Sequence, residues 1–375
     1  MTWLYLVLPG TLIWLGILAL PWRPWSTKES LDADPEGKPD LSRITALIPA
    51  RNEASVIEAT LPALARQGDN LQIILIDDQS NDSTANVARR LHLENLEVVS
   101  GKPMPSGWSG KLWALEQGRA HVDTEMTLLL DADIELKPGI LATLQQKLEA
   151  EDLQAISLMA QLRMVGFWEK LLMPAFIYFF KLLYPFRLSN SPAHAVAAAA
   201  GGCILLRTSM LDKIGGFHAL KDQLIDDCAL AQCIKAQGGH TWIGLTHSVR
   251  SIRSYEHLRS VWNTVARTAF TQLRYSNGLL VLCTLMLLAA FALPTAGVFF
   301  ASDGVRALSA LTLAAMASSY LPTLKYYGLS SAWAVWLPVI GMLYLAMTWT
   351  SAIRHWAGEG SRWKGRTYAD AANDG

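Results

Sequence analysis

The stretch MTLLLDAD, residues 126–133, places two acids directly after a short apolar run. Such a run, bounded by polar residues, predicts a buried strand over Met126–Leu130. Open α/β sheets bind ligands beyond the carboxyl ends of their strands, so Asp131 and Asp133 would lie at a ligand-binding edge. Two carboxylates separated by one residue suit a hard divalent cation, Mg²⁺ or Mn²⁺, that also binds a phosphate.

The segments around this stretch alternate between short apolar runs and longer amphipathic ones. Strands are predicted at Ile44–Pro49, Leu71–Asp77, Leu96–Val99, Met126–Leu130 and Ala155–Met159. Helices are predicted at Glu53–Arg66, Ser83–Leu91, Lys111–Ala120 and Pro138–Ala150. This alternation predicts an α/β fold with a mostly parallel, doubly wound sheet and helices on both faces.

The composition indicates that part of the chain lies in lipid. Of its 375 residues, 51% are hydrophobic and 17% are charged, whereas about 25% charged is usual for soluble proteins. Lys and Arg together number 32, as do Asp and Glu, so no basic surface predicts nucleic-acid binding. The four cysteines lack paired spacing, which favours free thiols.

Apolar segments at both ends are long enough to cross a bilayer. Trp3–Leu20 predicts an uncleaved anchor, and Arg23 and Lys28 after it favour a cytoplasmic position for that end. Three further candidate spans follow at Gly278–Phe300, Ala307–Leu321 and Ala332–Thr350. Three crossings would place the basic tail outside, against the positive-inside tendency, so the number of crossings stays open.

These patterns divide the chain into five parts. They are an N-terminal transmembrane anchor (1–22), a linker (23–43), an α/β domain (44–275), a C-terminal transmembrane region (276–353) and a tail (354–375). Within the α/β domain, residues 167–186 are rich in aromatic residues and interrupted by charges. That pattern predicts a helix lying in the membrane interface, with an ordinary core helix as the alternative.

Polar turns follow the first two predicted strands. IPARNE (48–53) places Asn52 where it could cap the next helix, and IDDQSNDST (76–84) follows the second strand. An acid at a strand end before a Ser- and Asn-rich helix start can bind a nucleobase or ribose. Helix capping alone would also explain Asp82 and Ser83.

The second half of the domain carries three further candidate elements. Gly201-Gly202 allow a close approach of the backbone to a substrate, or simply make a tight turn into a strand. Asp226 and Asp227 open a predicted helix, where they could act in catalysis or merely favour the helix dipole. TQLRY (271–275) precedes the first C-terminal span.

Taken together, IPARNE, IDDQSNDST, GWSGKLWAL (107–115) and DAD (131–133) resemble the nucleotide-sugar half of family 2 glycosyltransferases of the GT-A fold. The resemblance covers residues 44–275, and the motifs occur in the family's order. With the flanking apolar segments, the chain is similar to membrane glycosyltransferases associated with hopanoid biosynthesis. It also resembles ceramide and carotenoid glycosyltransferases.

The resemblance implies donor-side roles for six residues: Pro49, Glu53, Asp78, Lys111, Asp131 and Asp133. Asp78 would contact the uracil or ribose of the donor, in a pocket that Pro49 and Glu53 also line. Lys111 would face the phosphates, unless it is simply a solvated lysine that opens a helix. Asp131 would lie near the ribose and the metal, and Asp133 would be the main ligand of a Mg²⁺ or Mn²⁺ ion.

The resemblance also implies acceptor-side roles. Gly201 and Gly202 match the acceptor-side floor. Asp226-Asp227 match the family's E-D-x-D-L element with Asp227 as the base, although Ala229 replaces the later acid. In the position of Q-x-x-R-W, Arg274 would hold the diphosphate or mark the membrane boundary, and Thr271 replaces the Gln.

We therefore predict a metal-dependent, inverting glycosyltransferase of the hexosyltransferase type. It would move a sugar from a nucleotide sugar, with UDP as the expected nucleotide, to a hydroxyl of a membrane lipid, a hopanoid-type acceptor being the one suggested. It would be a multi-pass inner-membrane protein with a cytoplasmic catalytic domain. The alternatives are a processive polysaccharide synthase of the same fold and a non-catalytic nucleotide-binding membrane scaffold.

Overall fold

The computed structural model describes residues 2–34, 39–221, 223, 226–359, 362–363 and 366–367. The chain divides into two compact units. The sheet unit comprises Glu29–Arg163, Leu188–Ser254 and Arg362–Gly375, and the helical unit comprises Met1–Lys28, Met164–Arg187 and Tyr255–Ser361. Each unit is described separately below.

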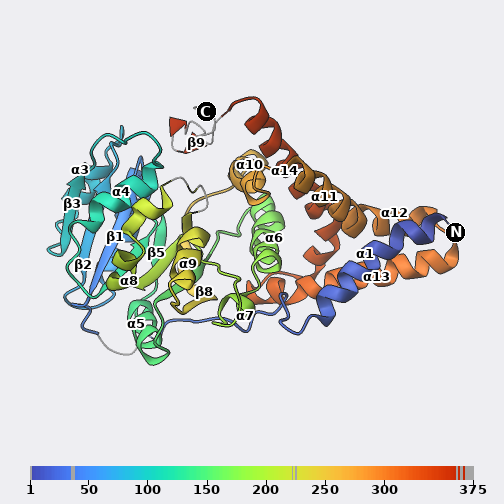
Figure 1. The fold of residues 1–375 in the computed structure, drawn as a ribbon, viewed down its shortest axis with the longest axis horizontal. Helices are drawn as coiled ribbons and strands as arrows, with labels where there is room; N and C mark the ends of the chain where they lie inside the picture. The colour runs from blue at the N-terminus through green and yellow to red at the C-terminus, as the bar shows by residue number, and fades with distance from the viewer. Residues whose placement is uncertain are drawn as a thin grey trace. The chain divides into compact units, whose positions relative to one another are not determined.

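The sheet unit is built on an eight-stranded mixed sheet in the order β3-β2-β1-β4-β7-β6-β8-β5 (Figure 1). The strands are β1 (Ile44–Ala50), β2 (Gln72–Asp77), β3 (Leu96–Ser100), β4 (Met126–Leu130), β5 (Ile134–Leu136), β6 (Ala155–Gln161), β7 (Cys203–Arg207) and β8 (Thr241–Ser251). Strands β1 to β4 are parallel to one another, as are β6 and β8, while β7 and β5 run antiparallel to their neighbours. The predicted mixed, mostly parallel sheet is confirmed.

Helices cover both faces of this sheet. One face is covered by α2 (Ala54–Ala65), α3 (Thr84–Arg90) and α5 (Ile140–Ala150). The other is covered by α4 (Gly110–Arg119), α8 (Thr208–Lys213), the 3-10 helix η1 (Gly216–Leu220) and α9 (Asp226–Ala236). Successive strand residues point to opposite faces, so Leu128 and Leu130 pack in the first core and Leu129 in the second. The uninterrupted apolar strands are therefore buried on both sides.

The strand register brings five chain segments to one edge of the sheet. The parallel strands β1, β2 and β4 all end at this edge. Leu130 pairs with Cys203, so the residues before β7 lie beside the residues after β4. Ile134 pairs with Ser251, which brings the end of β8 to the same place. Segments far apart in the sequence thus share one ligand-binding edge.

Part of the predicted linker is bound along β8. Ser30 forms a parallel bridge with Leu245, and the carboxylate of Asp32 accepts hydrogen bonds from the Thr246 hydroxyl and from the backbone and ring of His247. Residues 29–34 are therefore part of the sheet unit. Of the polar segment Leu31–Asp40, residues 35–38 lie outside the described part of the chain.

The helical unit contains the predicted apolar spans. Its helices are α1 (Thr2–Ala19), α6 (Phe167–Leu183), α10 (Leu258–Gln272), α11 (Asn277–Leu287), η2 (Leu288–Ala292), α12 (Leu293–Phe300), α13 (Asp303–Tyr326), η3 (Ser331–Trp336) and α14 (Leu337–Trp356). Four helical stretches in the described residues are long and apolar enough to cross a membrane: Thr2–Ala19, Asn277–Phe300, Asp303–Tyr326 and Ser331–Trp356. They match the four predicted spans.

The N-terminal helix α1 is packed into this unit. The Thr11 hydroxyl lies 2.7 Å from the Thr312 hydroxyl of α13, and the Trp14 indole donates to the Ala290 carbonyl of η2 at 2.8 Å. Hydroxyl pairs and small residues of this kind join membrane helices closely. The predicted anchor is therefore also a packed member of the bundle.

Helix α6 covers most of the predicted interfacial segment, and two of its charged residues, Glu169 and Lys181, are buried. It packs against α10, α13 and α14. Glu169 is fully buried and accepts hydrogen bonds from the backbone N–H groups of Val165, Gly166 and Tyr255. Lys181 is 1% exposed. This burial matches the alternative of a core helix.

Helices α6 and α10 belong to the helical unit. The sequence instead predicted both of them inside an α/β domain that ends at residue 275.

The tail contributes a two-residue antiparallel pair, β9 (Arg362–Trp363) with β10 (Arg366–Thr367). Lys364, one of the predicted basic tail residues, lies outside the described residues.

Candidate functional site at the carboxyl edge of the sheet

Lys111 is the centre of a first charged cluster. It lies in the first turn of α4, which Ser109 caps by accepting from the Leu112 N–H at 3.3 Å. Its Nζ lies 2.8 Å from Asp131 Oδ1, 3.9 Å from Asp226 Oδ2 and 3.4 Å from the Gly201 carbonyl. The structure therefore brings together one predicted donor-side acid, the acid pair of α9 and the glycine turn. A lysine this well paired is not simply solvated.

Asp227 is held against the glycine turn. Its Oδ2 accepts from the Gly201 N–H at 2.8 Å, and its Oδ1 accepts from the Cys228 N–H at 2.8 Å. Both contacts come from backbone groups, which move little. Asp227 is therefore held by two backbone groups. Asp226 lies 3.9 Å from Lys111 Nζ, a longer contact than the 2.8 Å between Lys111 and Asp131.

Burial and the charges of this cluster shift the pKa values of its side chains. Burial and the nearby Asp226 charge raise the pKa of Asp227 to about 6, although the Lys111 charge and the backbone N–H groups of Cys228 and Gly201 lower it. Burial likewise raises the pKa of Asp131, opposed by Lys111. Burial alone would lower the pKa of Lys111, but Asp131 and Asp226 outweigh it and keep the lysine charged. An acid that titrates near neutral pH is suited to accept a proton.

Arg253 is the centre of a second charged cluster. It follows β8, and its Nε lies 3.2 Å from Asp133 Oδ2 while its Nη2 lies 2.8 Å from Glu53 Oε1. The Ser251 hydroxyl also donates to Asp133 Oδ2 at 2.7 Å. The side chains of Glu53 and Asp133 are 9% and 11% exposed. Sequence reasoning did not identify Arg253, because it belongs to no recognised motif.

The turns after β1 and β2 are bonded to each other. The Arg51 guanidinium donates to the carbonyls of Asp78 and Gln79, and Asn52 Oδ1 accepts from the Asn81 N–H at 2.8 Å. Asn52 therefore does not cap α2 as predicted. Asp82 instead accepts from the Ala54 N–H at 3.2 Å and, as predicted, caps α3 through the Thr84 N–H.

The remaining predicted site residues lie in different places. Pro49 lies inside β1, paired with Ile76. Asp78 is fully buried at the end of β2, and its contact with a nucleobase stays a prediction. Arg274 belongs to the helical unit and has a left-handed backbone with φ 52°. Its contact with the diphosphate stays a prediction.

The two acids after β4 fit a divalent cation that takes its other ligands from a substrate. Among the described residues, no group of three or more His, Cys, Asp and Glu side chains could hold a metal alone. Each acid of the pair nevertheless has one carboxylate oxygen, Asp131 Oδ2 and Asp133 Oδ1, that accepts no hydrogen bond from the described residues. Mg²⁺ is commonly bound by one or two carboxylates together with substrate phosphates and water.

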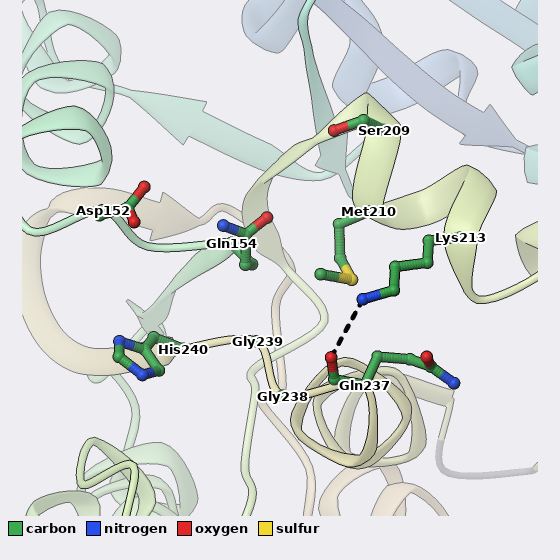
Figure 2. A pocket seen from close by; sticks show the side chains of 9 residues that line it. All are labelled: Asp152, Gln154, Ser209, Met210, Lys213, Gln237, Gly238, Gly239 and His240. Atoms are coloured by element: carbon green, nitrogen blue, oxygen red, sulfur yellow. Dashed lines mark hydrogen bonds between the residues drawn. The ribbon is translucent and has the colours of Figure 1, made fainter.

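A separate pocket lies at the opposite edge of the sheet, where β6 and β8 begin. It has a volume of about 430 Å³, and Lys213 there donates to the Gln237 carbonyl at 3.2 Å (Figure 2). It is lined by Asp152, Gln154, Ser209, Met210, Lys213, Gln237, Gly238, Gly239 and His240. None of the predicted site residues lines it.

Comparisons with known proteins agree with this geometry. Residues 45–215 match the family model described as glycosyl transferase family 2. The chain is 34% identical over 107 residues to a 4,4'-diaponeurosporenoate glycosyltransferase of Staphylococcus haemolyticus, covering 28% of each protein. It is 27% identical over 205 residues to the probable glycosyltransferase YdaM of Bacillus subtilis, covering 52% of this chain and 46% of the relative. The chain thus spans less than half the length of these curated relatives.

Among solved structures, the chain is similar to the mannosyltransferase PcManGT of Pyrobaculum calidifontis, solved in complex with GDP-Man and Mn²⁺. The TM-score is 0.54 at 18% identity, and the match covers 94% of this chain and 99% of that one. At this identity the likeness concerns the fold, which is that of a GT-A protein.

Proposed function

We propose that this chain, whose residues 45–215 match the model of glycosyl transferase family 2, belongs to that family. We further propose that it transfers a sugar from a UDP-sugar to a hydroxyl of a membrane lipid, with inversion at the anomeric carbon. The observation that carries the proposal is the cluster of Lys111, Asp131 and the Asp226-Asp227 pair at the carboxyl edge of the sheet. It combines phosphate-binding charge with an acid suited to proton transfer.

In the proposed reaction Asp227 Oδ accepts the proton of the acceptor hydroxyl. The hydroxyl oxygen then forms a bond to the anomeric carbon as the bond from that carbon to the donor phosphate breaks, and the nucleoside diphosphate leaves with the bonding electrons. The Gly201 and Cys228 N–H groups keep Asp227 in one orientation. General-base catalysis of this kind contributes about 10²–10⁴-fold, and positioning supplies much of the rest.

Asp131 and Asp133 would hold a Mg²⁺ or Mn²⁺ ion, which when bound neutralises the charge that develops on the departing diphosphate. Lys111 adds a fixed positive charge close to Asp131, and we propose that it contacts a phosphate oxygen. Asp78, Pro49 and Glu53 would line the nucleoside side of the pocket, and Arg274 would contact the diphosphate.

The apolar helices support a lipid acceptor. Four of them are long and apolar enough to cross a membrane, and one relative is named for 4,4'-diaponeurosporenoate, a carotenoid. We propose an apolar, hydroxyl-bearing acceptor of the hopanoid type, with the protein in the inner membrane and its site on the cytoplasmic side. Lipid mass spectrometry after reaction with a UDP-sugar tests this. One sugar added per lipid supports the proposal, and a ladder of sugars would instead indicate a polysaccharide synthase.

The pH dependence of transfer should follow Asp227. Because a general base acts only when it is ionised, we expect kcat/KM to rise with pH and reach half its maximum near pH 6, where burial and Asp226 place the pKa. UDP binding measured at the same pH values controls for donor affinity. A rate that stays constant from pH 7.5 down to pH 4.5 would exclude Asp227 as the base.

Gly201→Ala should lower transfer without unfolding the protein. A Cβ at Gly201 would lie 3.2 Å from Asp227 Oδ2 and 3.3 Å from Lys111 Nζ, so these two groups must shift by a few tenths of an ångström. We expect about a tenfold loss of kcat. Gly202→Ala is the matched control, because its Cβ would meet the Ile134 side chain at 3.2 Å. Equal losses in the two variants would show that the effect is not specific to the acid.

A further inference from the structure

Each acid of the Asp131-Asp133 pair already has a basic partner. Lys111 Nζ lies 2.8 Å from Asp131 Oδ1, and Arg253 Nε lies 3.2 Å from Asp133 Oδ2. The two bases come from different elements, Lys111 from the start of α4 and Arg253 from the segment after β8. A divalent cation that binds both acids must therefore enter next to two fixed positive charges.

Arg253 is placed to affect the acids by more than its charge. Its Nε and Nη2 hold two buried acids, Asp133 and Glu53, at the same time. Its Nη1 has no partner among the described residues, and its side chain is 34% exposed. A guanidinium can bind a phosphate in the same bidentate way as a carboxylate. Arg253 can thus exchange an acid for a phosphate without losing all its partners.

We propose that Lys111 and Arg253 are internal counter-ions of the Asp131-Asp133 pair, so that the pair binds a divalent cation weakly until a nucleoside diphosphate is also present. The inference rests on the proposed function for the identity of the nucleotide and adds a rule for the order of binding. Arg253 acts here as a positioning residue, since it acts through Asp133 and Glu53.

The physical reason is the balance of charge at the edge of the sheet. Without nucleotide, the cation competes with both bases for the same carboxylates, and unit charges a few ångströms apart interact by several kcal/mol at the dielectric typical of protein sites. A diphosphate supplies negative charge that attracts the cation and both bases together. The coupling is reciprocal, so UDP should strengthen Mn²⁺ binding by the same factor as Mn²⁺ strengthens UDP binding.

The test is Mn²⁺ binding to the full chain in detergent, measured from the electron paramagnetic resonance signal of free Mn²⁺, with and without UDP. For the wild type we expect UDP to tighten Mn²⁺ binding by at least about tenfold. Arg253→Gln should tighten Mn²⁺ binding without UDP by about tenfold and reduce the coupling. Arg253→Lys keeps the charge but not the fork that holds Asp133 and Glu53 together, so we expect it to lie between the wild type and Arg253→Gln.

Arg250→Gln is the matched control, since Arg250 is an exposed arginine near the end of β8, three residues before Arg253, and its replacement removes the same charge. If Arg253→Gln binds Mn²⁺ no more tightly than Arg250→Gln, the proposal is wrong. If Arg253→Gln does not fold, the measurement on the wild type still tests the proposal. The proposal is wrong if UDP binds to the wild type without changing its Mn²⁺ affinity. A wild type that binds no UDP even with Mn²⁺ would contradict the proposed function instead, while the nucleotide-free comparison would still test the counter-ion role.

Discussion

Replacing Asp227 with asparagine is expected to lower kcat for sugar transfer by about 10²–10⁴-fold while leaving UDP affinity near that of the wild type. Asparagine keeps the size of the side chain, and its one carbonyl oxygen can accept from one of the two backbone N–H groups that hold Asp227. It cannot accept the proton of the acceptor hydroxyl. Single-turnover transfer and UDP binding, measured on the same preparation, separate the two effects.

The same variant should not lose stability. The folded-state pKa of Asp227 is raised to about 6, above the ordinary value of 3.8. An acid with a raised pKa binds its proton more tightly in the folded state, so its ionisation costs stability above the folded pKa. At pH 7.5 the neutral asparagine removes this cost, which offsets the loss of one of the two backbone hydrogen bonds, and we expect Tm to stay near that of the wild type. A drop in both Tm and kcat would mean that Asp227 has a structural role.

Asp226→Asn provides the comparison within the acid pair. Asp226 lies 3.9 Å from Lys111 Nζ and forms no bond to the glycine turn, so we expect its replacement to cost less than that of Asp227. A larger loss at Asp226 would exchange the roles of the two acids.

Asp131→Asn is expected to lower kcat/KM by about 10²–10³-fold, a loss that added Mn²⁺ does not restore. The substitution removes a proposed oxygen ligand of the cation and the 2.8 Å partner of Lys111. Asp131 is also the more accessible acid of its pair, with a side chain 35% exposed against 11% for Asp133. The measurement is initial transfer rate as a function of Mn²⁺ concentration.

Two further variants complete this series. Asp133→Asn should also lower the transfer rate, because both acids are proposed to bind the same cation. Asp123→Asn makes the same chemical change in the loop before β4 and should leave the rate unchanged. Full transfer in both Asp131→Asn and Asp133→Asn would contradict the proposed cation site.

The first half of the sheet could be predicted because its strands are short apolar runs with polar ends. Met126–Leu130 was predicted with the observed bounds, and the other predicted strands differ by a residue or two at their ends. The antiparallel insertion of β7 between β4 and β6 was not predicted, because pairing between distant segments leaves no local pattern. Nor was β8, whose Thr, His and Ser residues interrupt its apolar alternation.

The candidate site shows the same limit. The motifs named Lys111, Asp131, Gly201 and the Asp226-Asp227 pair as separate candidates, and the structure shows that they meet in one cluster. Arg253 was missed, since it contacts Asp133 across 120 positions of the chain and a lone arginine after a strand carries no signal. For the same reason, the capping of α2 by Asp82 from the neighbouring turn was not foreseen.

In α6, composition does not show which charged residues are buried. Glu169 and Lys181 interrupt an apolar segment, a pattern typical of a helix at a membrane surface. In the structure both are buried, and Glu169 accepts three backbone N–H groups. A buried charge whose hydrogen bonds come from backbone groups cannot be told from an exposed one by sequence position alone.

The most direct test of the central claim is transfer of labelled sugar from a UDP-sugar into the lipid extract by the full chain in membranes with Mn²⁺, compared between the wild type and Asp227→Asn. The proposed function predicts one labelled sugar per lipid with the wild type and a loss of about 10²–10⁴-fold with Asp227→Asn. Equal labelling of lipid by the two proteins would contradict it.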